Sequence, residues 1–315
     1  MTSSCDFIEL TRWMTLLPPN LTSRPICELK IPGSHDSGAD RGLNCKLPVA
    51  NDEKGIVALA GKIPRIRKGI RRWAITQRLG IEDQLTCGVR YFDFRVSHPP
   101  ENLRRKLDDF ILVHALYGHT LVEALKKIRS FLDVNPLEII IIDINHAYGL
   151  DETAELSMRS KICEILGKES MCPQMLPSLC TLDYMHTKKY QIITLMPQSD
   201  NTNCSFWSQN FIRSPWINTN NRFSLFTNLQ KNLEYDRPQH PRILYVTQCV
   251  LTAHLSDVIL NWKSSLEREL SEETTVHAIK WMNSLSDCLK TNLNIVMSDV
   301  VCEAFVKSVI QLNYV

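Results

Sequence analysis

The stretch Glu138-Ile139-Ile140-Ile141-Ile142-Asp143 constrains the fold more than any other part of the chain. Four consecutive β-branched residues predict a strand over 138–145 that is covered on both faces, as strands of parallel sheets are. The run is far shorter than the roughly 20 residues of a membrane-spanning helix. We therefore interpret it as a buried strand, and Ile111 to Val113 has the same character.

Outward from this run, short β-rich segments alternate with helix-like segments. The sequence predicts strands over 26–31, 89–96, 110–114, 138–145, 191–196, 242–247 and 294–298, with helices such as 120–132 and 153–166 between them. This alternation is typical of parallel β/α units. We expect an α/β fold, a closed or slightly irregular TIM-type (β/α) barrel. A doubly wound open sheet is the alternative, but no Gly-rich phosphate loop follows an early strand.

The composition is that of an ordinary folded protein, with 44% hydrophobic and 22% charged residues among 315. Length alone allows two average domains or one barrel. Because no internal repeat or Gly/Ser linker appears, we expect a single catalytic domain over 1–315, with its motif-bearing core over about 25–150.

The cysteines and the N-terminus bear on the compartment. Eleven cysteines without metal-site spacing, and residues 1–19 without a basic start and apolar run, favour reduced thiols in the cytosol or nucleus. We expect a cytoplasmic protein and leave peripheral membrane association and a nuclear location open. No nucleic-acid partner is expected, and the oligomeric state stays open.

Residues 54–78 contain eight Lys or Arg and no acid. Apolar residues recur there at three- and four-residue steps, and Pro64 must kink or divide the amphipathic element that they predict. One interpretation is a helix packed on the body with a solvated cationic face. The other is a contact between Lys54 to Arg78 and an anionic membrane.

Polar residues follow the predicted strands. In a barrel, the loops at the carboxyl ends of the strands carry the chemistry. Two histidines, two acids and an arginine on one rim suit in-line displacement at a phosphodiester without a metal, since one imidazole can deprotonate the nucleophile and the other protonate the leaving oxygen. The strand-end residues are His35, Asp36, Arg95, His114, Asn145, His146, Gln248 and Asp299.

Three motifs at these strand ends occur in a characteristic order: Ile31-Pro32-Gly33-Ser34-His35-Asp36-Ser37, Gly88-Val89-Arg90-Tyr91-Phe92-Asp93-Phe94-Arg95 and Leu112-Val113-His114. They resemble the X domain of phosphatidylinositol-specific phospholipase C, in particular the small animal X-domain-only proteins. The likeness extends over nearly the whole chain. It implies a phosphoric diester hydrolase that cleaves phosphatidylinositol-like lipids to diacylglycerol and inositol (cyclic) phosphate.

The resemblance also implies roles. His35 resembles the general base that takes the proton of the inositol 2-hydroxyl, with Asp299 orienting it. His114 resembles the general acid for the diacylglycerol oxygen, with Asp36 as its carboxylate partner, and Arg95 would stabilise the pentacoordinate charge. Candidate substrate contacts are Asp93, Asn145, His146, Trp216, Tyr245 and Gln248.

A calcium requirement is not expected, although calcium binding stays open. Asp36 follows His35 where the calcium-dependent relatives have Asn, and Arg95 stands where a calcium-binding carboxylate would be. Asp93 has a second interpretation, a buried carboxylate that holds Arg95 or a histidine in place.

Ala115 follows His114 where most members of the family have Gly, so the loop beside the general acid has lost backbone freedom. This departure supports an alternative of a different class, a catalytically weak or silent X-domain protein that binds inositol lipid or a protein partner. A glycerophosphodiester hydrolase would need a cluster of metal-binding carboxylates that this rim lacks. The preferred phosphoinositide, the physiological signal and the catalytic efficiency are not specified by these patterns.

Overall fold

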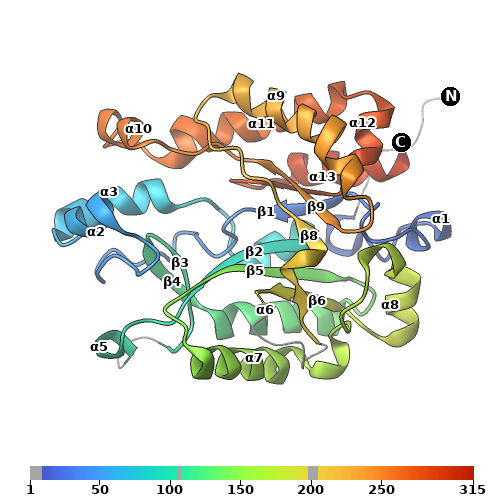
Figure 1. Cartoon of the computed structure of the whole chain (residues 1–315), viewed down its shortest axis with the longest axis horizontal. Helices are drawn as coiled ribbons and strands as arrows, with labels where there is room; N and C mark the ends of the chain where they lie inside the picture. The colour runs from blue at the N-terminus through green and yellow to red at the C-terminus, as the bar shows by residue number, and fades with distance from the viewer. Residues whose placement is uncertain (1–8, 105–107, 198–204) are drawn as a thin grey trace.

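The computed structural model describes residues 9–104, 108–197 and 205–315. Eight parallel strands lie side by side in chain order, and β10 pairs with β1. The sheet path ends at β7 and β8, which follow one another with only a 3-10 turn between them, so the barrel has one seam. The expected irregular TIM-type barrel is confirmed (Figure 1). Its strands are β1 (Ile31–Ser34), β2 (Tyr91–Ser97), β5 (Ile140–Tyr148), β6 (Ile192–Met196), β7 (Trp207–Ser208), β8 (Ile212–Arg213), β9 (Leu244–Cys249) and β10 (Ile295–Ser298).

The prediction that 110–114 is a barrel strand is wrong. β3 (Ile111–His114) and β4 (Leu116–Thr120) form an antiparallel hairpin, and β3 pairs antiparallel with the end of β2. Its apolar run is buried on both sides because Ile111 and Val113 pack in a small cluster with Ala50 and Tyr117, while Leu112 joins the main core. Burial on both faces therefore does not distinguish a barrel strand from a covered hairpin.

The first strand begins later than predicted. Residues 26–30 precede β1 in a turn, where Asn294 donates hydrogen bonds to the carbonyls of Ile26 and Leu29. β1 itself contains Gly33, where a Cβ would come within 2.8 Å of the Tyr91 ring. The prediction followed the apolar residues of 26–31 and so placed the strand too early. The strand that forms, Ile31–Ser34, contains Pro and Gly, which have low strand propensity.

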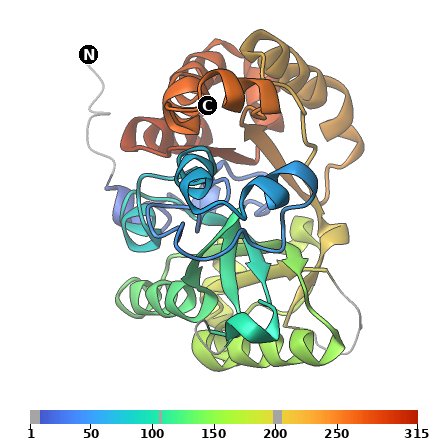
Figure 2. The ribbon, with the colours of Figure 1, turned by 90° about the vertical axis from the view of Figure 1, so that its left-hand side faces the viewer.

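Helices surround the barrel and cover the outer faces of its strands (Figures 1 and 2). The two helices that the sequence predicted are present as α6 and α7, each with a side-chain N-cap, from Thr120 and Asp151 respectively. The outer helices are α4 (Ile81–Thr86), α6 (Leu121–Val134), α7 (Glu152–Leu166), α8 (Leu182–Lys188), α9 (Arg222–Lys231), α11 (Glu272–Ser284), α12 (Asp287–Asn292) and α13 (Glu303–Gln311).

A separate group of helices stands at the carboxyl ends of the strands. Residues 54–78 form α2 (Gly55–Ala60) and α3 (Pro64–Ala74), divided at Pro64 as the sequence predicted, and α10 (Leu255–Leu260) lies opposite them across the rim (Figure 1). Among the described residues no helix combines the length and apolarity needed to cross a membrane. The nine cysteines in the described parts are free thiols; Cys5 and Cys204, and residues 1–8 of the N-terminal segment, lie outside them.

Candidate active site

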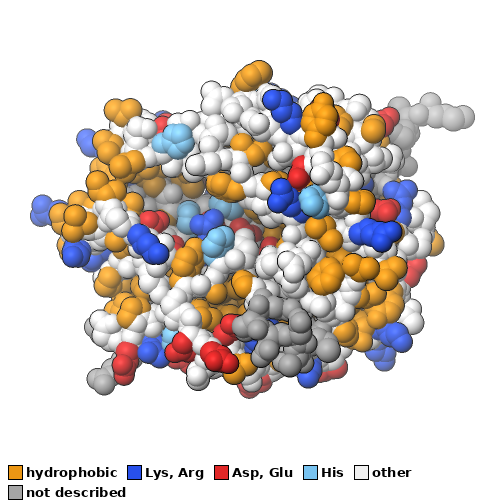
Figure 3. Space-filling model, in the orientation of Figure 1, with side chains coloured by type: hydrophobic (Ala, Val, Ile, Leu, Met, Phe, Trp, Pro, Cys, Tyr) orange, Lys and Arg blue, Asp and Glu red, His pale blue; other side chains and the backbone are white. Residues whose placement is uncertain are grey.

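A cavity of about 640 Å³ opens between α2, α3 and α10 at the carboxyl ends of the strands. Four predicted catalytic residues line it: His35, Arg95, His114 and Asp299. The fifth, Asp36, lies next to them, 2% exposed. Figure 3 shows the hollow with histidine side chains at its floor and hydrophobic side chains along its edge. The sequence therefore predicted correctly that these five residues gather on one rim.

His35 follows β1 and is almost completely buried. Its Nδ1 lies 2.8 Å from Asp299 Oδ1, and Ser271 donates a hydrogen bond to the other carboxylate oxygen. Since a carboxylate can only accept, Nδ1 is the donor and Nε2 faces Arg95 and Asp36. Burial lowers the pKa of His35, but Asp36 and Asp299 outweigh burial and raise it to about 9.

Asp36 is the central carboxylate of the site. Its Oδ1 lies 2.6 Å from Arg95 Nε, and its Oδ2 lies 3.4 Å from His35 Nε2 and 3.5 Å from His114 Nε2. Burial alone would raise the pKa of Asp36, but Arg95 and the two imidazoles lower it, so the carboxyl stays ionised. Burial lowers the pKa of Arg95, but the carboxylates of Asp36 and Asp93 outweigh burial and raise it overall.

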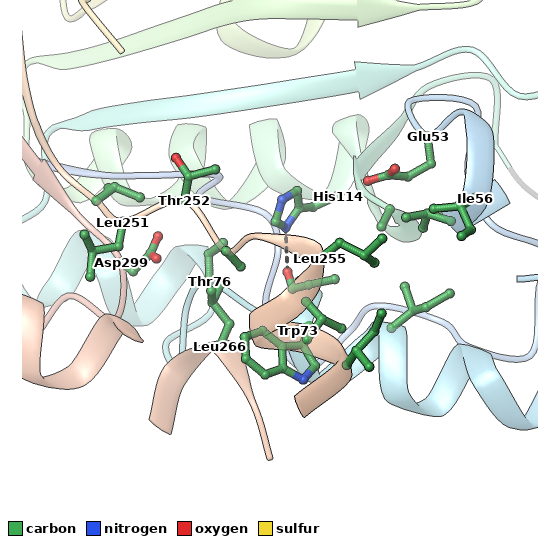
Figure 4. A pocket seen from close by; sticks show the side chains of 18 of the residues that line it. Glu53, Ile56, Trp73, Thr76, His114, Leu251, Thr252, Leu255, Leu266 and Asp299 are labelled. Carbon is green, nitrogen blue, oxygen red and sulfur yellow. Dashed lines mark hydrogen bonds between the residues drawn. The ribbon is translucent and has the colours of Figure 1, made fainter. Parts of the chain in front are cut away.

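His114 reaches the rim by an unexpected route. β2 and β5 extend beyond the barrel, and β3 returns antiparallel along β2, which brings His114 back to the level of the site. Its Nδ1 lies 2.7 Å from the carbonyl oxygen of Ala74, the last residue of α3, and must donate to it (Figure 4). Nε2 is therefore the nitrogen that faces Asp36 and the cavity.

Three of the four non-glycine residues with positive φ in the described chain lie at this rim: Asp36 (39°), Ala115 (57°) and Val300 (47°). Ala115 is fixed on both sides, since its N–H donates to Asp52 and its carbonyl accepts from the Ala50 N–H. Left-handed backbone favours glycine, so the structure explains why an alanine is unusual here.

Sequence reasoning missed several residues that hold the site. Gln77 donates to the carbonyls of His35 and Ser298 and accepts from the Val301 N–H, which ties the ends of β1 and β10 together. Thr76 donates to the Asp36 carbonyl. Both follow α3 rather than a strand, so the rule that directed attention to strand ends could not find them. Asp52 and Ser271 were missed for the same reason.

The candidate substrate contacts on β2 and β5 differ in availability. Asp93 is 1% exposed and accepts from the Asp36 N–H and from the Asn145 side chain. Burial, followed by the neighbouring Asp36, raises its pKa. Asp93 and Asn145 are therefore engaged with the protein, in line with the second interpretation of Asp93, whereas His146 is exposed beside them.

The remaining three candidates divide in the same way. Trp216 lines the cavity and stacks on the His35 ring at 5.5 Å between centroids. Gln248 donates to Ser214 and so holds the loop that carries Trp216. Tyr245 is not brought to the site: its hydroxyl donates to Asp236, and the side chain is 1% exposed against the outer helical layer.

One cluster of metal-type ligands exists among the described residues, formed by His35, Asp36 and Asp93. The Arg95 guanidinium already lies against this cluster, with Nε 2.6 Å from Asp36. A dication placed there would be repelled by a fixed positive charge at contact distance. The cluster offers one imidazole and two carboxylates, and the Asp36 carboxylate is already paired with Arg95. Calcium prefers six to eight oxygen ligands, so this set of donors does not fit it.

The basic face of α2 and α3 consists of two kinds of cation. Three guanidinium groups donate to backbone carbonyls: Arg67 to those of Cys45 and Gly61, Arg71 to those of Arg41 and Leu43, and Arg72 to those of Lys68, Trp262 and Ser264. Arg78 pairs with Glu267 and Glu272. These arginines stabilise the fold. The exposed cations are Lys54, Lys62, Arg65 and Lys68.

Comparison with known proteins agrees with this geometry. No protein-family model matches the chain. The chain is 30% identical over 309 residues to PI-PLC X domain-containing protein 2 of Mus musculus, covering 96% of this chain and 87% of that protein. Human PI-PLC X domain-containing protein 2 is 31% identical over 276 residues, 85% of each chain.

Among solved structures, phosphatidylinositol-specific phospholipase C from Listeria monocytogenes has a TM-score of 0.65 at 17% identity, and the match covers 97% of this chain and 99% of that one. A likeness at this identity establishes the fold, and the fold is the irregular barrel described above. The resemblance stated from the three motifs is thereby confirmed, and the chain belongs to the family of PI-PLC X domain-containing proteins.

Proposed function

We propose that the protein is a phosphatidylinositol-specific phospholipase C-type phosphodiesterase that works with two histidines and no metal. The observation that carries this proposal is the pair of imidazoles whose Nε2 atoms lie 3.4 and 3.5 Å from one oxygen of Asp36. In each ring Nδ1 is held by an acceptor, Asp299 or the Ala74 carbonyl. Both Nε2 atoms therefore face the same point of the cavity, where each can exchange a proton with a substrate.

In the first step His35 Nε2 takes the proton of the inositol 2-hydroxyl, and that oxygen attacks phosphorus. The bond from phosphorus to the glycerol oxygen breaks, and His114 Nε2 gives its proton to that oxygen. Diacylglycerol and inositol 1,2-cyclic phosphate result. Asp299 stabilises the imidazolium on His35, Asp36 does so for His114, and Arg95 offsets the negative charge that grows on the phosphoryl oxygens.

For the substrate-facing side we propose Trp216 and His146 as contacts, because Trp216 stacks on the His35 ring inside the cavity and His146 is exposed next to Arg95 in the strand register. We also propose that α2 and the start of α3 contact an anionic lipid surface. This region exposes four cations, Lys54, Lys62, Arg65 and Lys68, beside the apolar side chains of Ile56 and Leu59, which are 61% and 63% exposed. Changing the four cations to Glu should weaken binding to anionic vesicles. Arg67, Arg71 and Arg72 are unsuitable for that test because their loss would unfold the segment.

A second candidate function, an X-domain protein that binds lipid or a partner with little turnover, is favoured by one observation. Ala115 holds a left-handed backbone conformation directly after His114, and a displacement of the acid by about 1 Å can cost on the order of a hundredfold in rate.

The test is release of inositol 1,2-cyclic phosphate from phosphatidylinositol vesicles, followed by ³¹P NMR. His114→Ala should lower the rate by roughly 10²- to 10⁴-fold, with folding checked by circular dichroism. His186→Ala is the matched control, because His186 lies on α8 and bonds the Leu137 carbonyl far from the rim. Full turnover in His114→Ala would exclude the mechanism, and a folded wild type that releases no product would leave the second function.

A further inference from the structure

We propose that the apolar part of the cavity binds one hydrocarbon chain of the lipid leaving group, so that the substrate is held by the protein as well as by the membrane. This inference rests on the proposed function. The apolar walls come from three helices: α2 contributes Ile56, Val57 and Ala60, α3 contributes Ile66, Ile70 and Trp73, and α10 contributes Leu255, Val258 and Ile259. Trp262 and Leu266 extend the same lining beyond α10.

The apolar part begins where the leaving group would depart. His114 Nε2 would protonate the glycerol oxygen, and Trp73, Ala74 and Ala115 line the cavity together with His114. Figure 4 shows Leu255 and Trp73 around His114, with Ile56 further along the cavity. A chain attached to that glycerol therefore meets hydrocarbon walls as soon as it leaves the phosphate.

Charge is distributed accordingly. His35, Arg95, His114 and Asp299 belong to the catalytic end, and the other charged residue of the lining is Glu53. Burial, and next the adjacent Asp52, raises the pKa of Glu53. The remaining lining residues offer no charge to a polar ligand, whereas they suit an alkyl chain.

The size of the cavity favours one chain. A methylene group occupies about the space of a water molecule, so at roughly 30 Å³ each a chain of about 16 carbons needs roughly 480 Å³. The cavity measures about 640 Å³, which accommodates one such chain beside the reacting groups. At the mouth, Ile56, Leu255 and Ile259 are 61%, 46% and 62% exposed, which gives a chain an apolar path in from a lipid surface.

The first measurement uses dissolved substrates in buffer without membrane or detergent: glycerophosphoinositol, which has no chain, and lysophosphatidylinositols of 8, 12 and 16 carbons below their micelle concentrations. We expect kcat/KM to rise with chain length, by at most about fourfold per methylene. Equal kcat/KM across the series would overturn the inference while leaving the proposed phosphodiesterase intact.

A cavity-filling variant localises the effect. Ala60→Trp places an indole in the lining, and the ratio of kcat/KM for the 16-carbon substrate to that for glycerophosphoinositol should collapse by at least tenfold. Ala58→Trp is the matched control on the same helix, since Ala58 is not part of the lining, and it should keep the wild-type ratio. A ratio that falls equally in both variants, or in neither, would contradict the assignment.

Binding can be measured without catalysis. A monoacylglycerol brominated along its chain should quench the fluorescence of Trp73 and Trp262, which line the apolar part. The quench should shrink in Trp73→Phe/Trp262→Phe and should be prevented by Ala60→Trp. If no substrate is turned over but the quench occurs, the proposed function fails and the chain site stands. If the quench is absent in the wild type, the chain site is refuted whatever the turnover.

Discussion

The pKa of His35 links the stability of the protein to its proposed activity. The pKa rises from 6.5 to about 9 on folding, and at about 1.36 kcal/mol per pKa unit this amounts to about 3 kcal/mol. Between these pH values the native state holds one proton more than the unfolded chain. The contribution is therefore fully present below pH 6.5 and is lost as the pH rises through 9.

His35→Gln removes the titration, since a Gln side chain can still donate to Asp299 but carries no ionisable group. We expect the free energy of unfolding of the wild type, measured by urea and tryptophan fluorescence, to fall by about 3 kcal/mol relative to this variant between pH 6.5 and 9. His146→Gln is the matched control. Burial and then Arg95 lower the pKa of His146, so its contribution changes below pH 6.5 and the slope above that value should stay as in the wild type.

The same proton governs the proposed reaction. A base must be neutral, and with a pKa of about 9 only about one His35 in a hundred is neutral at pH 7. The neutral fraction of His35 should therefore climb close to tenfold per pH unit up to about pH 9, and kcat/KM for phosphatidylinositol should follow it over the pH range in which His114 keeps the proton that it gives to the leaving group. Stability curves for wild type and His35→Gln that run parallel between pH 6.5 and 9 would refute the reasoning on His35.

Three further predictions concern its neighbours. A chelator should leave turnover unchanged because Arg95 occupies the position of a cation, and a loss that added calcium restores would contradict this. Asp299→Asn should lower kcat roughly a hundredfold and move the pH profile of kcat/KM to lower pH, because the carboxylate that raises the pKa of His35 is gone; an unshifted profile would count against it. Ala115→Gly should change the free energy of unfolding by less than about 1 kcal/mol, since relief of left-handed strain, about 1 kcal/mol, is offset by the backbone entropy of glycine; a loss above about 2 kcal/mol in thermal or urea unfolding would show that the Ala115 side chain has another role.

The gathering of the five proposed catalytic residues was predictable from the sequence because of one geometric rule. Parallel strands end at one rim of a barrel, so residues that follow separate strands become neighbours without any information on packing. This rule brings His35, Arg95 and Asp299 together. The rule does not apply to His114, which ends an antiparallel strand. This residue reaches the rim because β3 runs back along β2.

Other features depend on tertiary detail that residue types do not encode. Tyr245 and Gln248 lie three positions apart on β9, so their side chains point to opposite faces of the strand. Which face meets the site is decided by strand register, and Tyr245 lies on the side of Asp236. The acceptor for His114 is the backbone carbonyl of Ala74, and every residue has a carbonyl, so no sequence pattern could single it out.

The strained positions show what keeps the proposed site in place. Asp36, Ala115 and Val300 each carry an unfavourable left-handed backbone, at about 1 to 2 kcal/mol apiece. Each is held by its own N–H, which donates to Asp93, to Asp52 and to the Thr76 carbonyl respectively. The acceptors therefore offset the strain, and the strain directs the chain so that the two imidazoles meet at Asp36. It follows that Asp93 and Asp52 act as positioning residues, whose loss should misplace His35 and His114 before it unfolds the barrel.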